Sequence, residues 1–300
     1  MSRERFAALL DEPFELSRRD NRWLALAPNL VAFAADDFAG WRRLQQEAWL
    51  LDRWRRIGGV PAPRVLREDA VRRVQVRERM HGLTGDELHR EDSLSPLYSP
   101  ALAANPDVRA RLVDAGSAAP LSPFGERLAA SYGDLAARIR RSVDTMEAET
   151  VAIGPTSRRS LDVDAAIAAL DASAAASAAA KAAAHRTRDW LATLTPINAV
   201  IHADLHFHNM CAAPSGDIIG VFDLSDSGLD NAESEFLYAQ SLGTQFAQIA
   251  MAAYGSPLDE RAVVHAHLRT ALDHVAYHGP TTPRHASVVA WATAVFELLA

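Results

Sequence analysis

The chain has 300 residues, of which 49% are hydrophobic and 23% charged, and a formal net charge of −7. This composition predicts a soluble globular protein of one large domain or two lobes, and it argues against a disordered chain and against a nucleic-acid partner. A single cysteine excludes an intrachain disulfide framework. With no signal-peptide core at the N-terminus and no apolar stretch of spanning length, we expect a cytoplasmic protein without membrane contact.

Residues 1–82 predict a small antiparallel sheet with one helix. Strands are expected at 14–16 and 30–33, with the apolar segment 23–26 between them, and a helix is expected over 40–56, where apolar residues recur at helical spacing. Gly58 and Gly59 would end this helix. A further strand follows the prolines of 60–66, and 71–80 alternates arginine with apolar residues, as an edge strand would.

The remainder predicts mainly helices. Residues 92–124 are rich in Ser, Pro and Ala and indicate an irregular insertion, and a helix is expected over 125–145. The alanine-rich stretch 163–184 predicts a surface helix that buries little apolar area. From Glu233 onward we expect packed helices with breaks near 255–257 and 279–280.

Two polar motifs lie near residue 200. Asp204 is followed five residues later by Asn209 and fourteen residues after that by Asp223. Short apolar strands at 200–201 and 218–222 flank a turn cluster at 214–217, so we expect these two strands to form a hairpin that brings the three side chains together. A carboxylate can accept a hydroxyl proton, and an amide with a second carboxylate suits Mg²⁺.

The motifs H-x-D-L-H-x-x-N (202–209) and G-V-x-D-x-x-D-x-G-L (220–229) resemble those of the aminoglycoside phosphotransferase and choline kinase superfamily. The resemblance implies an α+β, two-lobed protein-kinase-like fold, with residues 1–82 as the nucleotide-binding lobe and 83–300 as the catalytic and substrate-binding lobe. It also implies transfer of the γ-phosphoryl group of ATP or GTP to a hydroxyl of a small molecule, with Mg²⁺ as cofactor.

The resemblance assigns roles residue by residue. Asp204 would be the catalytic acid that accepts the hydroxyl proton, and Asn209 and Asp223 the metal ligands. Supporting roles would fall to the side chains around them: His202, His206, Asp226 and Glu235. Glu235 stands where the family usually has an aspartate that braces the catalytic loop, so its longer side chain is a departure.

The nucleotide-binding lobe departs further from the family pattern. Glu47 stands where the family has a helix glutamate, but the strand at 30–35 lacks the lysine that pairs with it, and the one lysine of the sequence is Lys181. The loop at 17–22 contains no glycine. Arginines of that loop are the candidates to replace the lysine, although a guanidinium binds phosphate with a different geometry. These are Arg18, Arg19 and Arg22.

Two other readings remain open at this stage. The missing lysine and glycines would also suit a pseudokinase that acts as a binding or regulatory module. Alternatively, His202, Asp204, His206 and His208 would face one side of a continuous strand and could bind zinc in a hydrolase.

The substrate is not encoded in an obvious motif. Residues 1–82 hold 16 arginines against 12 acidic residues, and residues 200–300 hold three arginines against 11 acidic residues. A positive first lobe suits nucleotide phosphates, and a negative last third suits a cationic acceptor. An aminoglycoside or another amino-containing antibiotic or metabolite is therefore a candidate acceptor, on the strength of four acidic residues that follow the second motif: Asp226, Asp230, Glu233 and Glu235.

Overall fold

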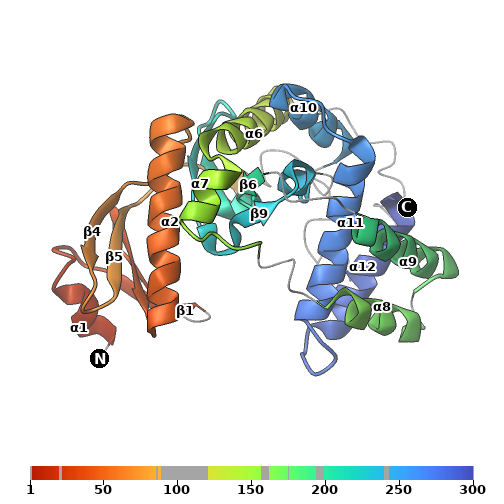
Figure 1. Cartoon of the computed structure of the whole chain (residues 1–300), viewed down its shortest axis with the longest axis horizontal. Coiled ribbons are helices and arrows are strands. Elements are labelled where there is room, and N and C mark those ends of the chain that lie inside the picture. The colour runs from red at the N-terminus through yellow and green to blue at the C-terminus, as the bar shows by residue number, and fades with distance from the viewer. Residues whose placement is uncertain are drawn as a thin grey trace.

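The computed structural model describes residues 2–19, 22–85, 87–88, 121–156, 162–174, 176–193, 199–239 and 243–299. An N-terminal five-stranded antiparallel sheet stands beside a mainly helical remainder, which gives an α+β architecture (Figure 1). The predicted insertion at 92–124 falls outside the described residues up to position 120. Among the described helices, none is long and apolar enough to cross a membrane.

The sheet has the order β1-β2-β3-β5-β4. Its strands are β1 (Glu15–Arg19), β2 (Arg22–Leu26), β3 (Leu30–Ala35), β4 (Val65–Asp69) and β5 (Val74–Glu78). Along β3 successive side chains point to opposite faces, so Ala32 and Ala34 pack under α1 (Ser2–Ala7), while Phe33 and Ala35 face α2 (Phe38–Ile57).

The position of β5 corrects the expectation of an edge strand at 71–80. The strand lies between β3 and β4, and four consecutive residues of it are buried: Val74, Gln75, Val76 and Arg77. The alternation of arginine with apolar residues suggested a solvated face. Instead, the polar face of β5 is turned into the protein, where Arg77 is neutralised by a carboxylate.

Helix α2 connects the sheet to the rest of the chain. It begins at Asp37, whose side chain accepts a hydrogen bond from Gly40 N at 2.7 Å, and it ends at Gly58, as the glycine pair predicted. Its buried face carries large apolar side chains and one charged residue, Glu47, which is 1% exposed. A buried carboxylate requires a partner, so α2 must be anchored at this point.

The main hydrophobic core lies between α2, the packed helices α6 (Pro123–Ser142) and α10 (Thr244–Tyr254), and the short strands behind them. α6 and α10 run together along the top of Figure 1. Their close approach depends on Gly133, where a Cβ atom would lie 1.9 Å from the carbonyl oxygen of Ala250. At 145–150 the short helix α7 (Thr145–Thr150) follows α6.

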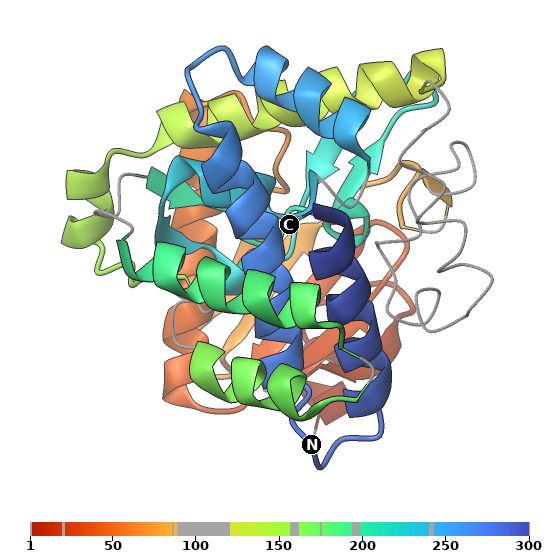
Figure 2. The same cartoon turned by 90° about the vertical axis from the view of Figure 1, so that its right-hand side faces the viewer.

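A second core joins α8 (Val163–Ala172) and α9 (Ala178–Thr193) to α11 (Glu260–Tyr277) and α12 (His285–Leu299). Figure 2 shows α8 and α9 lying across α11 and α12. The alanine-rich segment is thus two helices instead of one. It contributes a buried face of small side chains, including Ala180 and Ala184, so the expectation that it buries little was wrong. The breaks predicted near 255–257 and 279–280 are confirmed.

The hairpin was predicted with the wrong partner. β8 (Ile218–Val221) pairs with β7 (Met210–Ala212), whereas β6 (Ala199–Ile201) pairs with β9 (Gly228–Asp230). The turn cluster at 214–217 does connect the hairpin. A three-residue strand such as β7 has too few residues for an apolar alternation to reveal it.

Candidate active site

Asp204 lies in the loop that follows β6. Both oxygens of its carboxylate accept hydrogen bonds, Oδ2 from Asn209 Nδ2 at 2.8 Å and Oδ1 from the Tyr238 hydroxyl at 2.9 Å. The side chain retains 18% exposure. The preceding residue, Ala203, has a left-handed φ of 65°, a conformation that favours glycine, and typical family members carry glycine there. The carboxylate is thus held at a fixed orientation but is reachable from outside.

His202 connects the two loops that carry the acidic residues. Its Nε2 lies 3.0 Å from the carbonyl oxygen of Phe222, which can only accept, so Nε2 carries the proton. Nδ1 is then free to accept from the backbone N–H of Asp204 at 3.3 Å. Burial lowers the pKa of His202, more than the nearby carboxylates raise it, and the ring stacks on Trp54. A neutral imidazole therefore sets the spacing between Asp204 and the residue before Asp223.

His206 supports the same loop from the other side. Its Nδ1 accepts a hydrogen bond from the backbone N–H of His208 at 3.1 Å and so caps the 3-10 helix η4 (Phe207–Asn209). Because Nδ1 accepts, the proton of the neutral ring lies on Nε2, which is 3.3 Å from Asp204 Oδ2.

Glu235, in the 3-10 helix η6 (Ala232–Phe236), braces the loop that carries Asp204. Its Oε2 accepts a hydrogen bond from the backbone N–H of His202 at 2.7 Å. Burial raises the pKa of Glu235 to about 8, against the opposing effect of the backbone N–H groups of His202 and Ala203. The longer acid still reaches the loop.

Asn209 and Asp223 lie side by side on the hairpin. The backbone N–H of Phe222 donates to the carbonyl oxygen of Asn209 at 2.9 Å, and Asp223 follows immediately with a left-handed φ of 60°. The Asn209 amide nitrogen is directed at Asp204, so the oxygen of that planar group points away from Asp204. Asp226 lies one turn further on, in the 3-10 helix η5 (Leu224–Asp226), and is partly buried.

Arg22 occupies the space between the sheet and the hairpin. Its Nη1 lies 2.9 Å from Glu47 Oε1, and its Nη2 lies 2.7 Å from Asp223 Oδ1. A second arginine, Arg77 on β5, lies 2.8 Å from the other oxygen of Glu47. Burial opposes the ionisation of Glu47, but Arg77 and Arg22 outweigh it and hold the pKa of Glu47 below its usual value. Glu47 is thus an anion between two guanidiniums.

The other loop arginines do not join this cluster. Arg18 pairs with the exposed Asp36 and lies over the ring of Trp23, away from Glu47 and Asp223. The side chain of Arg19 falls outside the described residues. α2 makes a further link, because Arg43 donates to the carbonyl oxygens of Ser225 and Ser227 in the loop after Asp223.

The donor set fits Mg²⁺ better than zinc. An amide oxygen from Asn209 and a carboxylate from Asp223, which is 46% exposed, are the few hard oxygen ligands that Mg²⁺ takes when phosphates supply the rest. Within the described ranges no group of three or more His, Cys, Asp and Glu side chains is arranged to hold a metal. The residues from His202 to His208 form a loop and a 3-10 helix instead of a continuous strand, so the zinc interpretation fails on geometry.

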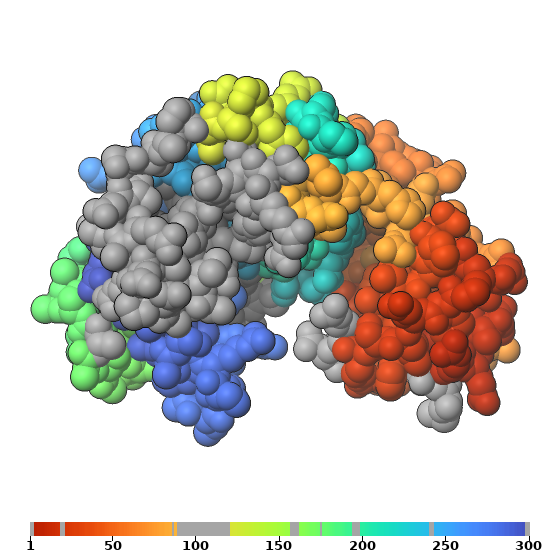
Figure 3. Space-filling model, turned by 180° about the vertical axis from the view of Figure 1, so that it is seen from behind, coloured from red at the N-terminus to blue at the C-terminus, as the bar shows by residue number. Residues whose placement is uncertain are grey.

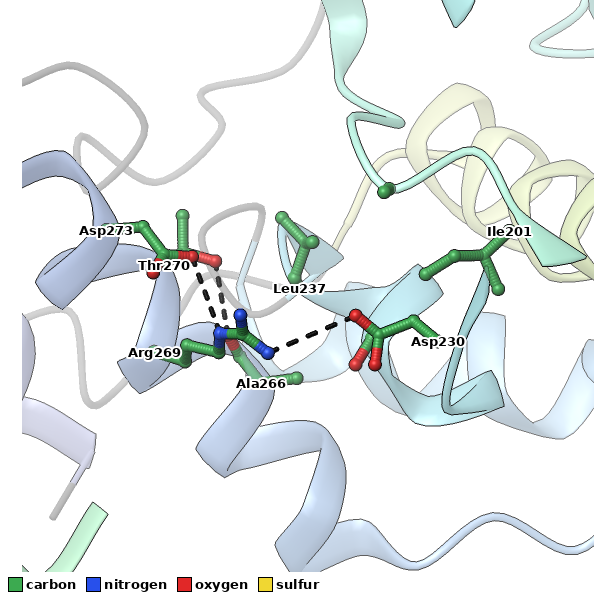
Figure 4. A pocket seen from close by; sticks show the side chains of 9 residues that line it. Ile201, Asp230, Leu237, Ala266, Arg269, Thr270 and Asp273 are labelled. Carbon is green, nitrogen blue, oxygen red and sulfur yellow. Dashed lines mark hydrogen bonds and ion pairs between the residues drawn. The ribbon is translucent and has the colours of Figure 1, made fainter. Parts of the chain in front are cut away.

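A small cavity lies behind the catalytic loop (Figure 4). Arg269 of α11 extends into it between Asp273, at 3.6 Å, and Asp230, at 4.0 Å. The cavity has a volume of about 10 Å³, enough for about one water molecule and far below the size of a substrate. Asp230 also accepts from Thr156 Oγ1 at 2.8 Å, and so it is engaged within the protein.

Of the four acidic residues that favoured a cationic acceptor, only two remain accessible to a ligand. Asp230 and Glu235 are each 2% exposed and bonded internally, whereas Asp226 and Glu233 are partly exposed.

A hollow separates the N-terminal sheet from the C-terminal helices when the molecule is seen from behind (Figure 3).

A profile of the phosphotransferase enzyme family (APH) matches residues 17–267. The chain belongs to this family. The match spans the sheet, the Glu47 cluster and the catalytic loop together, and it identifies the protein as a small-molecule kinase with a kinase-like fold. Comparison with curated protein sequences found no match.

Solved structures of phosphotransferases share the fold. Aminoglycoside 2'-phosphotransferase-IIIa in its GDP complex is 12% identical, with a TM-score of 0.68 over 98% of this chain and 95% of that one. The streptomycin–ATP complex of APH(2")-IIa is 14% identical, with a TM-score of 0.63 over 96% and 93%. Macrolide 2'-phosphotransferase MphH from Brachybacterium faecium is 16% identical, with a TM-score of 0.61 over 95% and 94%. At these identities the likeness establishes the fold.

Two residues of the candidate site were not foreseen from the sequence. Tyr238 lies 34 positions after Asp204 in an irregular segment, and no spacing rule indicates that its hydroxyl reaches the carboxylate. Arg77 was missed because its alternation with apolar residues indicated an exposed edge strand, whereas β5 pairs with β3 inside the sheet.

Proposed function

We propose that this phosphotransferase transfers the γ-phosphoryl group of ATP or GTP, as a magnesium complex, to a hydroxyl group of a small molecule. The observation that carries the proposal is the convergence of Asp204, Asn209 and Asp223. Asn209 donates to Asp204 at 2.8 Å and lies beside Asp223 on the hairpin, so one side chain connects the acid for the acceptor with the acid for the metal.

In the proposed mechanism Asp204 orients the acceptor hydroxyl and takes its proton as the oxygen–phosphorus bond forms, while the bond between the γ-phosphorus and the bridging oxygen breaks and the nucleoside diphosphate leaves. Tyr238 and Asn209 hold the carboxylate in place, which supplies the positioning on which phosphoryl transfer depends. Mg²⁺, bound through Asn209 and Asp223, would neutralise charge on the phosphates. Arg22, which pairs with Asp223 at 2.7 Å, takes the role that a strand lysine has in other family members.

The acceptor is proposed as a hydroxylated small molecule, with amino-containing compounds such as aminoglycosides as the first candidates. Asp226 and Glu233 are the acidic residues left to meet an ammonium group, since Asp230 and Glu235 are engaged inside the protein. Macrolides belong in the same screen, because relatives of this fold act on them.

A titration of ATP and GTP, with and without Mg²⁺, into the wild type and Asp223→Asn tests the nucleotide site by calorimetry. Magnesium-dependent binding that the substitution abolishes supports the proposal. A screen of hydroxyl acceptors then follows, in which Asp204→Asn should lower turnover by about 10²–10⁴-fold. Turnover that is unchanged in Asp204→Asn would refute the assignment.

The ion pair between Arg22 and Asp223 supports one alternative. Because this ion pair occupies a proposed metal ligand, the protein could also be a catalytically impaired binding module. That alternative requires that neither nucleotide binds in the titration above and that no acceptor is phosphorylated.

A further inference from the structure

Arg22 holds two carboxylates with two different nitrogens. Nη1 faces Glu47 and Nη2 faces Asp223, so one guanidinium bridges α2 and the hairpin. The two partners differ in their surroundings: the Glu47 side chain is 1% exposed, whereas that of Asp223 is 46% exposed. The bond to Asp223 is therefore the one that solvent or a ligand can reach.

Glu47 does not depend on Arg22 alone. Arg77 occupies its second oxygen at 2.8 Å, and Gln75 Oε1 accepts from Arg77 Nε at 2.6 Å, which fixes the orientation of this guanidinium. Arg77 is 2% exposed. Glu47 consequently keeps a buried, fixed cation even if Arg22 changes its partner.

The aromatic ring between the strands supports both cations. The guanidinium carbons of Arg22 and Arg77 lie 4.8 Å and 4.6 Å from the ring centre of Phe33 on β3, within the range of cation–π attraction. Phe33 lies on β3, the strand on which family members carry the lysine. Its ring stabilises the Arg22 guanidinium whether or not Arg22 is paired with Asp223.

We propose that Arg22 is an exchangeable cation that competes with the divalent metal for Asp223, while Arg77 permanently holds Glu47. Without nucleotide, Arg22 neutralises Asp223. When a metal–nucleotide complex binds, Asp223 turns to the metal, and the released Nη2 of Arg22 turns to a phosphate oxygen. This inference rests on the proposed function, because it takes Asp223 as the metal ligand.

The exchange predicts effects of opposite sign for one substitution. Removal of the guanidinium frees Asp223 and removes a positive charge beside the metal position, so the nucleotide-free protein should bind a divalent cation about tenfold more tightly, as expected for the loss of one charge-assisted hydrogen bond. The same substitution removes a phosphate partner and should weaken binding of the metal–nucleotide complex. Simple structural damage would weaken both.

The test is a Mn²⁺ titration of the full chain without nucleotide, followed by electron paramagnetic resonance, for the wild type, Arg22→Gln and Arg22→Lys. Arg64→Gln is the matched control, because Arg64 also pairs with an acid of the sheet, Glu78, in an exposed ion pair. Tighter Mn²⁺ binding in Arg22→Gln, a smaller gain in Arg22→Lys and no change in the control support the exchange. Unchanged or weaker Mn²⁺ binding in Arg22→Gln overturns it.

Asp223→Asn separates this inference from the proposed function. If it abolishes Mn²⁺ binding but Arg22→Gln has no effect, the metal site stands and the exchange is wrong. If Asp223→Asn binds Mn²⁺ like the wild type, the metal site itself is wrong, and the exchange falls with it.

Discussion

Glu235 should make the stability of this protein depend on pH near neutrality. One of its oxygens accepts from the His202 backbone N–H, and within the described part of the chain the other, Oε1, is buried without a hydrogen-bond partner. Burial raises the pKa of this carboxyl from 4.5 to about 8. The folded protein therefore holds a proton here that the unfolded chain releases over most of this interval.

The sign of the effect follows from this difference. At a pH well below 4.5 the carboxyl is neutral in both the folded and the unfolded state, and its burial then costs the least free energy. As the pH rises toward 8 the unfolded chain ionises while the folded protein stays protonated, so the free energy of unfolding falls, and it levels off once both are ionised. Between pH 6 and pH 9 the free energy of unfolding should fall by about 2–3 kcal/mol because of this one group.

Glu235→Gln removes the titration but keeps an acceptor for the His202 N–H. We expect the variant to match the wild type within about 1 kcal/mol at low pH and to be more stable than it at pH 9. The assay is urea unfolding at pH 6 and pH 9 on both proteins, which cancels the contributions of all other titrating groups. Parallel pH dependence in the two proteins would refute the reasoning, because it would mean that Glu235 is ionised in the folded state.

Three further predictions concern the same regions. Tyr238→Phe removes a hydrogen bond to the Asp204 carboxylate and should lower kcat about tenfold without changing the KM for nucleotide; an unchanged kcat contradicts the positioning role. Gly133→Ala should lower the free energy of unfolding by about 1–3 kcal/mol, because its methyl group would collide with the α10 backbone, whereas Gly154→Ala, with open space around it, should have little effect; equal stabilities in urea would count against this packing. Burial raises the pKa of the Cys211 thiol to about 11, so a thiol reagent at pH 8 should label it only after unfolding, and rapid labelling of the native protein would contradict its burial.

The sequence was most informative where local rules set the structure. The glycines after α2 correctly marked the end of that helix, and the breaks in the last third follow from glycine and proline. Strand pairing was harder, because the partner of a three-residue strand is chosen by contacts distant in the chain. This is why β8 was assigned to the wrong neighbour and β5 to the wrong place in the sheet.

The site shows the same division. Asp204, Asn209 and Asp223 could be named because they stand close together in the sequence, in two recognisable motifs. The β7–β8 hairpin joins Asn209 to Asp223, and Asn209 Nδ2 reaches Asp204. The Glu47 cluster could be named only in part: the acid was found, and Arg22 was one of three candidates, but Arg77 pairs with Glu47 across the sheet and helix, a contact that no local pattern encodes. Tyr238 is a similar case, since its hydroxyl reaches Asp204 only through the fold of an irregular segment.

The guanidinium pair at Glu47 also determines which chemistry can modify this protein. Acetylation enzymes and amine-reactive affinity labels acylate the amine of a lysine side chain, and a guanidinium is no substrate for them. The one lysine of the sequence, Lys181, lies on α9, where its ammonium donates to the carbonyl oxygen of Asp171. Reagents that label kinases at the strand lysine would therefore not label this enzyme at that position. A survey of kinases that relies on such reagents would not detect it.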